Sequence, residues 1–164
     1  MKEQVVVANP YNEEHIHMFQ RYEEQNNISS STSQYLIRTK NMMGEADFKR
    51  LEKESPEIIR ILFRQNKGEI VAVAHLIGEK DRKICRMTID NTSSIQQQEK
   101  LLTDAERYAF TNLGMEEIIL LQEQGNQIPS TYFASHEFDD LGVESGMQVY
   151  MKSRGQEKKA TYQI

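Results

Sequence analysis

The chain has 164 residues, of which 38% are hydrophobic and 27% charged, and these values suit one folded domain of ordinary composition. Its apolar runs are too short to cross a bilayer, and its first residues lack the layout of a secretory signal. A net charge of −5 argues against a nucleic-acid-binding protein, and the single cysteine, Cys85, excludes an internal disulfide and favours a reducing cytoplasm.

The first third of the chain predicts one strand followed by helices. The β-branched run "QVVVA" predicts a strand over residues 4–8. Asn12 is a suitable cap for a helix whose apolar residues recur at helical spacing. The polar stretch "NNISSSTS", residues 26–33, predicts a loop, and residues 34–54 predict two short helices that break at Gly44.

The middle of the chain changes to the two-residue period of strands after Pro56. Residues 57–65 and 69–78 are strand-like and flank "NKG", so they predict a hairpin with a tight turn. A further strand is predicted over Ile84–Ile89, after the turn "EKDRK".

The last third predicts a helix and strand twice over. Apolar residues at helical spacing predict a helix over Glu99–Leu113, followed by a buried strand over residues 116–122. A second helix is predicted from Pro129 to Gly142, followed by a strand over residues 147–153.

This order of elements predicts an α+β fold. Early hairpins followed by a strand–helix–strand crossover should give a mixed, mostly antiparallel central sheet with helices on both faces. Because no linker divides the chain, we expect a single domain over residues 1–153. Residues 154–164 hold a small basic cluster and are expected to form a tail.

Three phrases resemble the GNAT superfamily, whose members transfer an acyl group from acyl-coenzyme A to an amine. "ICRMTID" resembles the central strand of these proteins, and "EKLLTDAERYAFTNLGMEEIIL" resembles the helix and strand that follow it. "FDDLGVESGMQVYMKS" is similar to their closing helix–strand phrase. The resemblance extends from about Glu57 to Lys152 and implies a GNAT-like N-acyltransferase fold and acetyl-CoA as cofactor.

The same resemblance implies where the coenzyme would bind. The backbone of Met87, Thr88 and Ile89 would pair with the pantetheine arm. The phosphates would be held by Ser93, Ser94 and the N–H groups of Gln96, Gln97 and Gln98, at the N-terminus of the helix. In the family this loop is rich in glycine, which lets the backbone approach the phosphates closely, whereas here it contains none.

The resemblance also implies catalytic positions that this chain fills differently. Cys85 replaces the glutamate that serves many members as general base. Phe138 replaces the tyrosine that protonates the departing thiolate, and Tyr132 is the nearest tyrosine before it in the sequence. His75, in the predicted strand "EIVAVAHLIG", is either a core or cleft-lining residue or a base near the acceptor amine.

Three hypotheses for function remain open. The first is an acyl-CoA-dependent N-acyltransferase with an atypical phosphate loop, acting on a small-molecule or peptide amine. The second is a catalytically inactive GNAT-fold protein that binds or regulates a protein partner, and the third is a hydrolase or sensor that binds another small molecule. No metal site is predicted, because His15 and His17 are two residues apart on a helix and point in different directions. A homodimer is left open.

Overall fold

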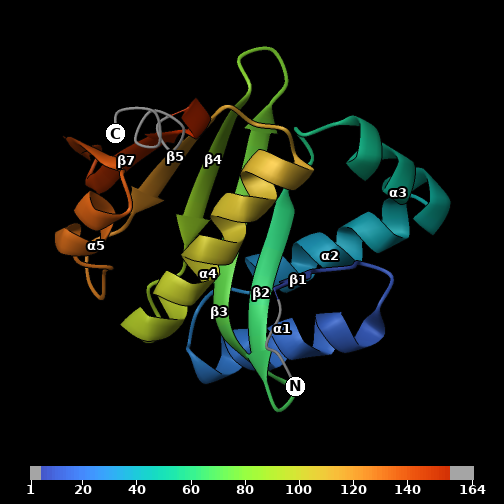
Figure 1. Cartoon of the computed structure of the whole chain (residues 1–164). Helices are drawn as coiled ribbons and strands as arrows, with labels where there is room; N and C mark the ends of the chain where they lie inside the picture. Colours follow the sequence, from blue (N-terminus) through green and yellow to red (C-terminus); the bar gives the residue numbers. More distant parts are fainter. Residues whose placement is uncertain (1–4, 156–164) are drawn as a thin grey trace.

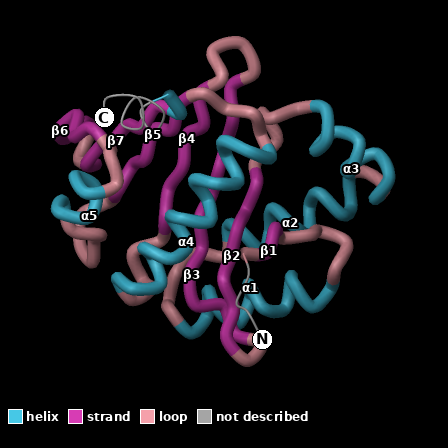
Figure 2. The backbone as a smooth tube through the Cα atoms, in the orientation of Figure 1, coloured by secondary structure: helices cyan, strands magenta, loops and turns pink. Residues whose placement is uncertain are grey.

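The computed structural model describes residues 5–155, which are organised around one seven-stranded sheet (Figures 1 and 2). The strand order is β1-β2-β3-β4-β5-β7-β6, and only the β4–β5 pair is parallel. The strands are β1 (Val6–Val7), β2 (Arg60–Asn66), β3 (Glu69–Glu79), β4 (Ile84–Ile89), β5 (Glu117–Gln122), β6 (Asp139–Glu144) and β7 (Met147–Ser153). The predicted mixed, mostly antiparallel α+β sheet is therefore confirmed.

Helices cover both faces of this sheet, as Figure 1 shows. They are α1 (Glu13–Gln25), α2 (Ser31–Met42), α3 (Glu45–Glu54), α4 (Ile95–Arg107) and α5 (Ser130–Ser135), and a π-helical turn, Tyr108–Asn112, continues α4. Within residues 5–155 no helix is both long and apolar enough to cross a membrane.

Alternating side chains of β2 separate two apolar cores. Leu62 packs with Leu101 and Leu102 of α4 on one face of the sheet. Its neighbours Ile61 and Phe63 pack on the other face against α1, where Phe19 meets Phe63 edge-on with ring centroids 5.3 Å apart. This two-residue alternation places α4 and α1 on opposite faces.

Several local predictions are confirmed. The Asn12 side chain caps α1 by accepting hydrogen bonds from the N–H groups of Glu14 at 3.0 Å and His15 at 3.3 Å. Gly44 separates α2 from α3. The β2–β3 hairpin turns at Lys67 and Gly68, which both have positive φ, as a primed two-residue turn requires.

Other boundaries differ from those predicted. The α2 helix begins at Ser31, inside the predicted loop, and α4 begins at Ile95 rather than Glu99. The predicted helix from Pro129 to Gly142 is wrong in its second half, because α5 ends at Ser135 and β6 follows, paired with β7. Most of the predicted tail, residues 156–164, lies outside the described residues.

The close approach of β3 to Pro56 predicts the effect of one substitution. The Gly78 N–H donates a hydrogen bond to the Pro56 carbonyl at 2.9 Å, and a Cβ on Gly78 would lie 2.8 Å from the Pro56 Cβ. We therefore expect Gly78→Ala to lower the free energy of unfolding by about 1–3 kcal/mol, measured by urea denaturation. Gly44→Ala is the control, because its Cβ would meet nothing within 4 Å, and its cost should stay below about 1 kcal/mol. Equal costs for the two variants would contradict this account.

Candidate acceptor and coenzyme site

A cavity of about 350 Å³ lies at the carboxyl ends of β4 and β5. The segment that joins α1 to α2 and the first residues of α2 form one wall, and β3 and the loop after β4 form the others. The lining residues are Ile28, Ser29, Ser31, Thr32, His75, Thr88, Ile89, Asp90, Asn91, Thr92, Leu121 and Glu123. Segments far apart in the sequence therefore meet at one place, where a sheet of this kind commonly binds a ligand.

His75 is the catalytic candidate from the sequence that lines the cavity, together with Thr88 and Ile89 of the predicted coenzyme site. It lies on β3, and its Nε2 is 3.1 Å from the Thr32 hydroxyl of α2. Burial lowers the pKa of His75 below its ordinary value, and the nearby charge of Asp90 opposes this shift only in part. The imidazole is therefore neutral at pH 7 and can accept a proton.

Asp90 is a second cavity residue, which the sequence analysis did not select. Its backbone N–H donates to the Val73 carbonyl at 3.0 Å, and its Oδ2 accepts a hydrogen bond from the Tyr22 hydroxyl at 3.3 Å. Burial raises the pKa of Asp90, and the charge of His75 opposes that shift. A signal was available, because a carboxylate directly after a buried strand is a common ligand position.

Tyr22 of α1 contacts Asp90 and the loop after β4 through its hydroxyl. Its hydroxyl lies 2.7 Å from the Thr92 hydroxyl as well as near Asp90. Burial, followed by the charge of Asp90, raises the pKa of Tyr22 to about 12, so the phenol stays protonated and can donate. Tyr22 thus holds the Asp90 side chain in place.

The N-terminus of α4 offers a smaller anion site than the resemblance implies. Ser94 caps the helix, because its Oγ accepts a hydrogen bond from the Gln97 N–H at 3.3 Å. The Gln98 N–H is also engaged, with the Ser94 carbonyl at 3.0 Å. Helix geometry leaves the N–H groups of Ile95 and Gln96 without partners inside the helix, and the helix dipole adds positive charge there.

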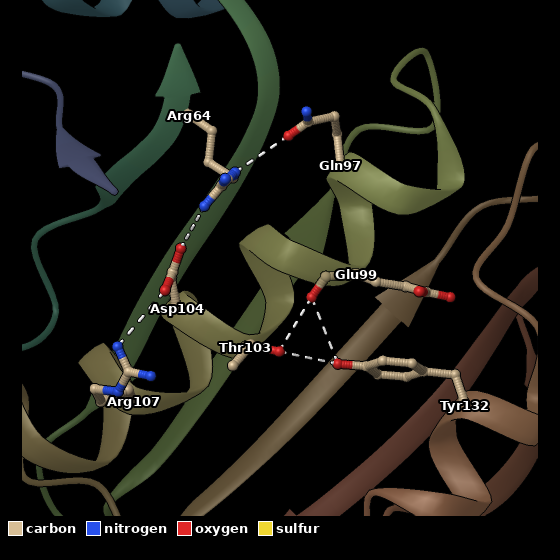
Figure 3. Close-up of polar contacts among 7 residues, drawn as sticks. All are labelled: Arg64, Gln97, Glu99, Thr103, Asp104, Arg107 and Tyr132. Carbon is tan, nitrogen blue, oxygen red and sulfur yellow. Dashed lines mark hydrogen bonds and ion pairs between the residues drawn. The ribbon is translucent and has the colours of Figure 1, made fainter. Parts of the chain in front are cut away.

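The Gln97 side chain is held on the other side of the helix. Its Oε1 accepts a hydrogen bond from the Arg64 Nε at 3.2 Å, and the same arginine pairs with Asp104 at 2.9 Å (Figure 3). The side chain is thus turned towards β2 and the body of α4. Its predicted part in phosphate binding is not favoured, because both its N–H and its amide oxygen already have partners.

Side-chain amides join the loop after β4 to the loop after β5. The Gln98 Nε2 donates to the carbonyls of Ser93 at 2.9 Å and Asn126 at 3.0 Å, and the Asn126 Nδ2 donates to Ser93 at 2.7 Å. The Asn91 Nδ2 donates to the Gln124 carbonyl at 3.0 Å. We call these four hydrogen bonds the amide clasp.

The clasp involves two predicted phosphate ligands, Ser93 and Gln98, of which Gln98 was predicted to bind through its backbone N–H. The side chains of Ser93 and Gln98 are buried, so neither faces solvent. Ser93 Oγ lies near the Tyr22 hydroxyl and makes no hydrogen bond of standard geometry. Both residues hold the two loops together, and a serine or glutamine pattern alone does not reveal on which side of a loop the side chains lie.

The β4 backbone is largely paired where the pantetheine arm was expected. Met87 and Thr88 pair with Leu120 and Leu121 of the parallel neighbour β5, as well as with β3 on the other side. Ile89 is the first β4 residue beyond this ladder on the β5 side. Pairing of the arm with β4 therefore remains a prediction, and Ile89 is the position where it could begin.

Cys85 is unsuited to act as a base. Its side chain is fully buried in the core on the α4 face and does not line the cavity. Burial raises the pKa of its thiol to about 12, and the charge of Arg60 opposes this only in part. Cys85 is therefore a core residue, contrary to its candidacy as a base.

Tyr132 lies between α5 and α4, away from the cavity lining. Its hydroxyl is 3.1 Å from the Thr103 hydroxyl and donates to the Glu99 carbonyl at 3.5 Å (Figure 3). Burial raises its pKa. Phe138, the residue in place of the family's acid, is buried against Phe133 and contributes no proton. These contacts favour a structural role for both aromatic residues.

No group of three or more His, Cys, Asp or Glu side chains is placed to hold a metal ion in the part of the chain that the structure describes. The polar side chains that line the cavity are an imidazole, two carboxylates, the Asn91 amide and several hydroxyls. These groups suit proton transfer and hydrogen bonding to a small polar molecule.

Comparison with known proteins identifies the fold. No protein-family model and no curated protein matches the sequence significantly. Among solved structures, the aminoglycoside acetyltransferase AAC(6')-Ib matches with a TM-score of 0.65 and 11% identity over 100% of both chains. The spermidine/spermine N-acetyltransferase SpeG from Vibrio cholerae matches with a TM-score of 0.63 and 11% identity, over 98% of this chain and 99% of its own. The N-acetyltransferase PseH from Campylobacter jejuni, solved with acetyl coenzyme A, matches with a TM-score of 0.57 and 12% identity over 92% of this chain and 99% of its own.

These similarities extend over nearly the whole chain, including the N-terminal part that precedes the sequence resemblance from about Glu57 to Lys152. At 11–12% identity these similarities establish the fold and not the activity. The resemblance seen in the sequence is therefore confirmed at the level of the fold: this chain has the fold of the GNAT acetyltransferases.

Proposed function

We propose that this protein is an acyl-CoA-dependent N-acyltransferase that acylates a small amine bound beside His75 and Asp90. The observation that carries the proposal is the cavity at the ends of β4 and β5, which holds His75 and Asp90, two groups that each shift the pKa of the other. Structural neighbours that act on spermidine or on aminoglycosides, both of which are amines, support this class of acceptor.

The chain fits one phosphate group of the coenzyme better than a full diphosphate cradle. The N–H groups of Ile95 and Gln96 would hold that group, aided by the dipole of α4, and the exposed Ser94 lies beside them. When bound, acyl-CoA would supply a thioester carbonyl as the electrophile. Its acyl end would have to reach the cavity near Ile89, beyond the end of the β4–β5 ladder.

The residues of the cavity would prepare the amine. A primary amine is protonated at neutral pH and cannot attack a carbonyl until it loses a proton. His75 would take that proton, and the Asp90 carboxylate would stabilise the imidazolium that forms. Thr32, at 3.1 Å from the imidazole, would hold the ring in its orientation.

The amide clasp favours a second candidate function, that of a catalytically inactive GNAT-fold binding protein. Three of its hydrogen bonds connect the loop after β4 or the start of α4 to the loop after β5, where the coenzyme would enter. Only if the clasp opens or the coenzyme passes outside it can acyl transfer occur. A protein that keeps the clasp closed would bind a ligand in the cavity without transferring an acyl group to it.

Calorimetric titration with acetyl-CoA tests the first proposal. We expect binding that Gln96→Asp weakens by at least about tenfold, because a new carboxylate at the first turn of α4 would repel a phosphate group. The same charge should stabilise the helix, so a loss of binding cannot be attributed to unfolding. Gln96→Asn is the matched control and should bind as the native protein does.

A panel of primary amines, including spermidine and an aminoglycoside, is then assayed for release of the free thiol of coenzyme A. Saturable binding and amine-dependent thiol release support the acyltransferase. If acetyl-CoA at millimolar concentration neither binds nor shifts the unfolding temperature, the acyltransferase proposal fails and the binding protein is favoured.

A further inference from the structure

The charge of the cavity wall indicates the chemical class of its ligand. We propose that the cavity selects an acceptor with two cationic amino groups and no anionic group, that is, a short aliphatic diamine or polyamine. This inference rests on the proposed function for its second step, acylation, but the binding preference itself can be measured without the coenzyme.

The carboxylate side chains that line the cavity are Asp90 and Glu123. Asp90 and Glu123 both line the cavity, and they lie close enough that the charge of Glu123 helps to raise the pKa of Asp90. Among residues 5–155, no lysine or arginine lines it. A carboxylate or phosphate on the ligand would therefore meet two negative charges and find no cationic partner, and such like-charge contacts are a strong basis for excluding a ligand.

The reacting amine and the bound cation of the ligand must be different groups. A carboxylate stabilises an ammonium group and so opposes the loss of the proton that the reaction needs. Asp90 lies beside His75, its charge partner, and also accepts a hydrogen bond from Tyr22. Glu123 is exposed and follows the end of β5, so it is placed to hold a second ammonium group that stays charged.

The size and polarity of the cavity suit a short diamine. A volume of about 350 Å³ is near the lower end for ligand pockets and suits a short chain. The hydroxyls of Thr32, Thr88 and Thr92 border it and can accept hydrogen bonds from N–H groups. Ile28, Ile89 and Leu121 provide apolar surface for the methylene groups between two amines.

Three related probes separate these contributions in a calorimetric titration without coenzyme. The probes are 1,5-diaminopentane, pentylamine, which lacks the second amine, and L-lysine, which adds a carboxylate to the diamine. We expect 1,5-diaminopentane to bind about tenfold or more tightly than either of the others, since each comparison removes a charge-assisted contact or adds a repulsive one.

Two substitutions locate the effect. In Glu123→Gln the preference for 1,5-diaminopentane over pentylamine should fall to near one. Glu69→Gln, which neutralises an exposed carboxylate in the β2–β3 hairpin outside the cavity lining, should leave the preference unchanged. Unfolding temperatures of both variants establish that each remains folded.

The possible outcomes separate the diamine preference from the acyltransferase proposal. Equal binding of the three probes, or a preference that survives Glu123→Gln, overturns the inference even if another amine is acylated. The expected preference without any binding of acetyl-CoA supports the diamine site and at the same time rejects the acyltransferase proposal.

Discussion

Replacing His75 with asparagine is expected to lower kcat/KM for acyl transfer at neutral pH by about a hundred-fold or more, the usual contribution of a general base. Asparagine can still form a hydrogen bond with Thr32 but cannot take a proton from the amine. Steady-state assay with the best acceptor of the amine panel measures the effect. His17→Asn is the matched control, because His17 is exposed on α1, and it should leave kcat/KM unchanged.

The pH profile distinguishes a base from a wall residue. Burial lowers the pKa of His75, so its neutral form is present above that lowered value and is lost as the pH falls through it. In the native protein kcat/KM should therefore rise with pH through a region below 6.5, where protonation of Asp90, whose pKa burial raises, also contributes. The His75→Asn variant should lose the part of this limb that belongs to His75.

Tyr22, which also lies near the cavity, should not contribute to the acidic limb of the pH profile. Burial and the charge of Asp90 raise the pKa of Tyr22 to about 12, so it stays protonated throughout this range. If kcat/KM and its acidic limb are both unchanged in His75→Asn, the imidazole is a cleft-lining residue and another group must deprotonate the amine.

Replacing Glu106 with glutamine is expected to lower the free energy of unfolding by about 3–5 kcal/mol. Glu106 of α4 pairs with Lys152 of β7, and the two side chains are only 12% and 5% exposed. Lys152 also lies over the Phe138 ring, 5.5 Å from its centroid. Loss of the carboxylate would remove the Glu106 charge from beside the buried Lys152 ammonium group, which costs more than the pair itself contributes.

Urea denaturation of three variants tests this expectation. Glu106→Gln should be strongly destabilised, whereas the double variant Glu106→Leu with Lys152→Met should recover most of the stability, because it removes both charges from the interior. Glu14→Gln is the control, since it breaks an exposed pair with Arg21 and should cost less than about 1 kcal/mol. A cost of this small size for Glu106→Gln would show that water reaches the buried pair.

Much of the fold could be predicted from local patterns, because the residues concerned carry their own signals. The apolar spacing of Leu101, Leu102 and Ala105 requires a helix with one buried face, and "NKG" between two β-branched runs requires a hairpin. The β6 strand had no such signal. Leu141 and Val143 alternate over only three residues, too short a run to mark a strand, and both are exposed. The segment is a strand because β7 offers backbone partners beside it.

The candidate site likewise has features that the sequence predicts and features that depend on the tertiary structure. The sequence by itself determined the GNAT frame, the placement of His75 on a strand and the absence of loop glycines, since each depends on residue type and short-range order. Only the tertiary structure decided that Thr32, Asp90 and Glu123 meet His75 in one cavity, because they come from α2, the loop after β4 and the loop after β5, which the sheet order brings together. It also turned Ser93 and Gln98 inward, because the loop after β4 packs against the loop after β5, a contact that no local pattern encodes.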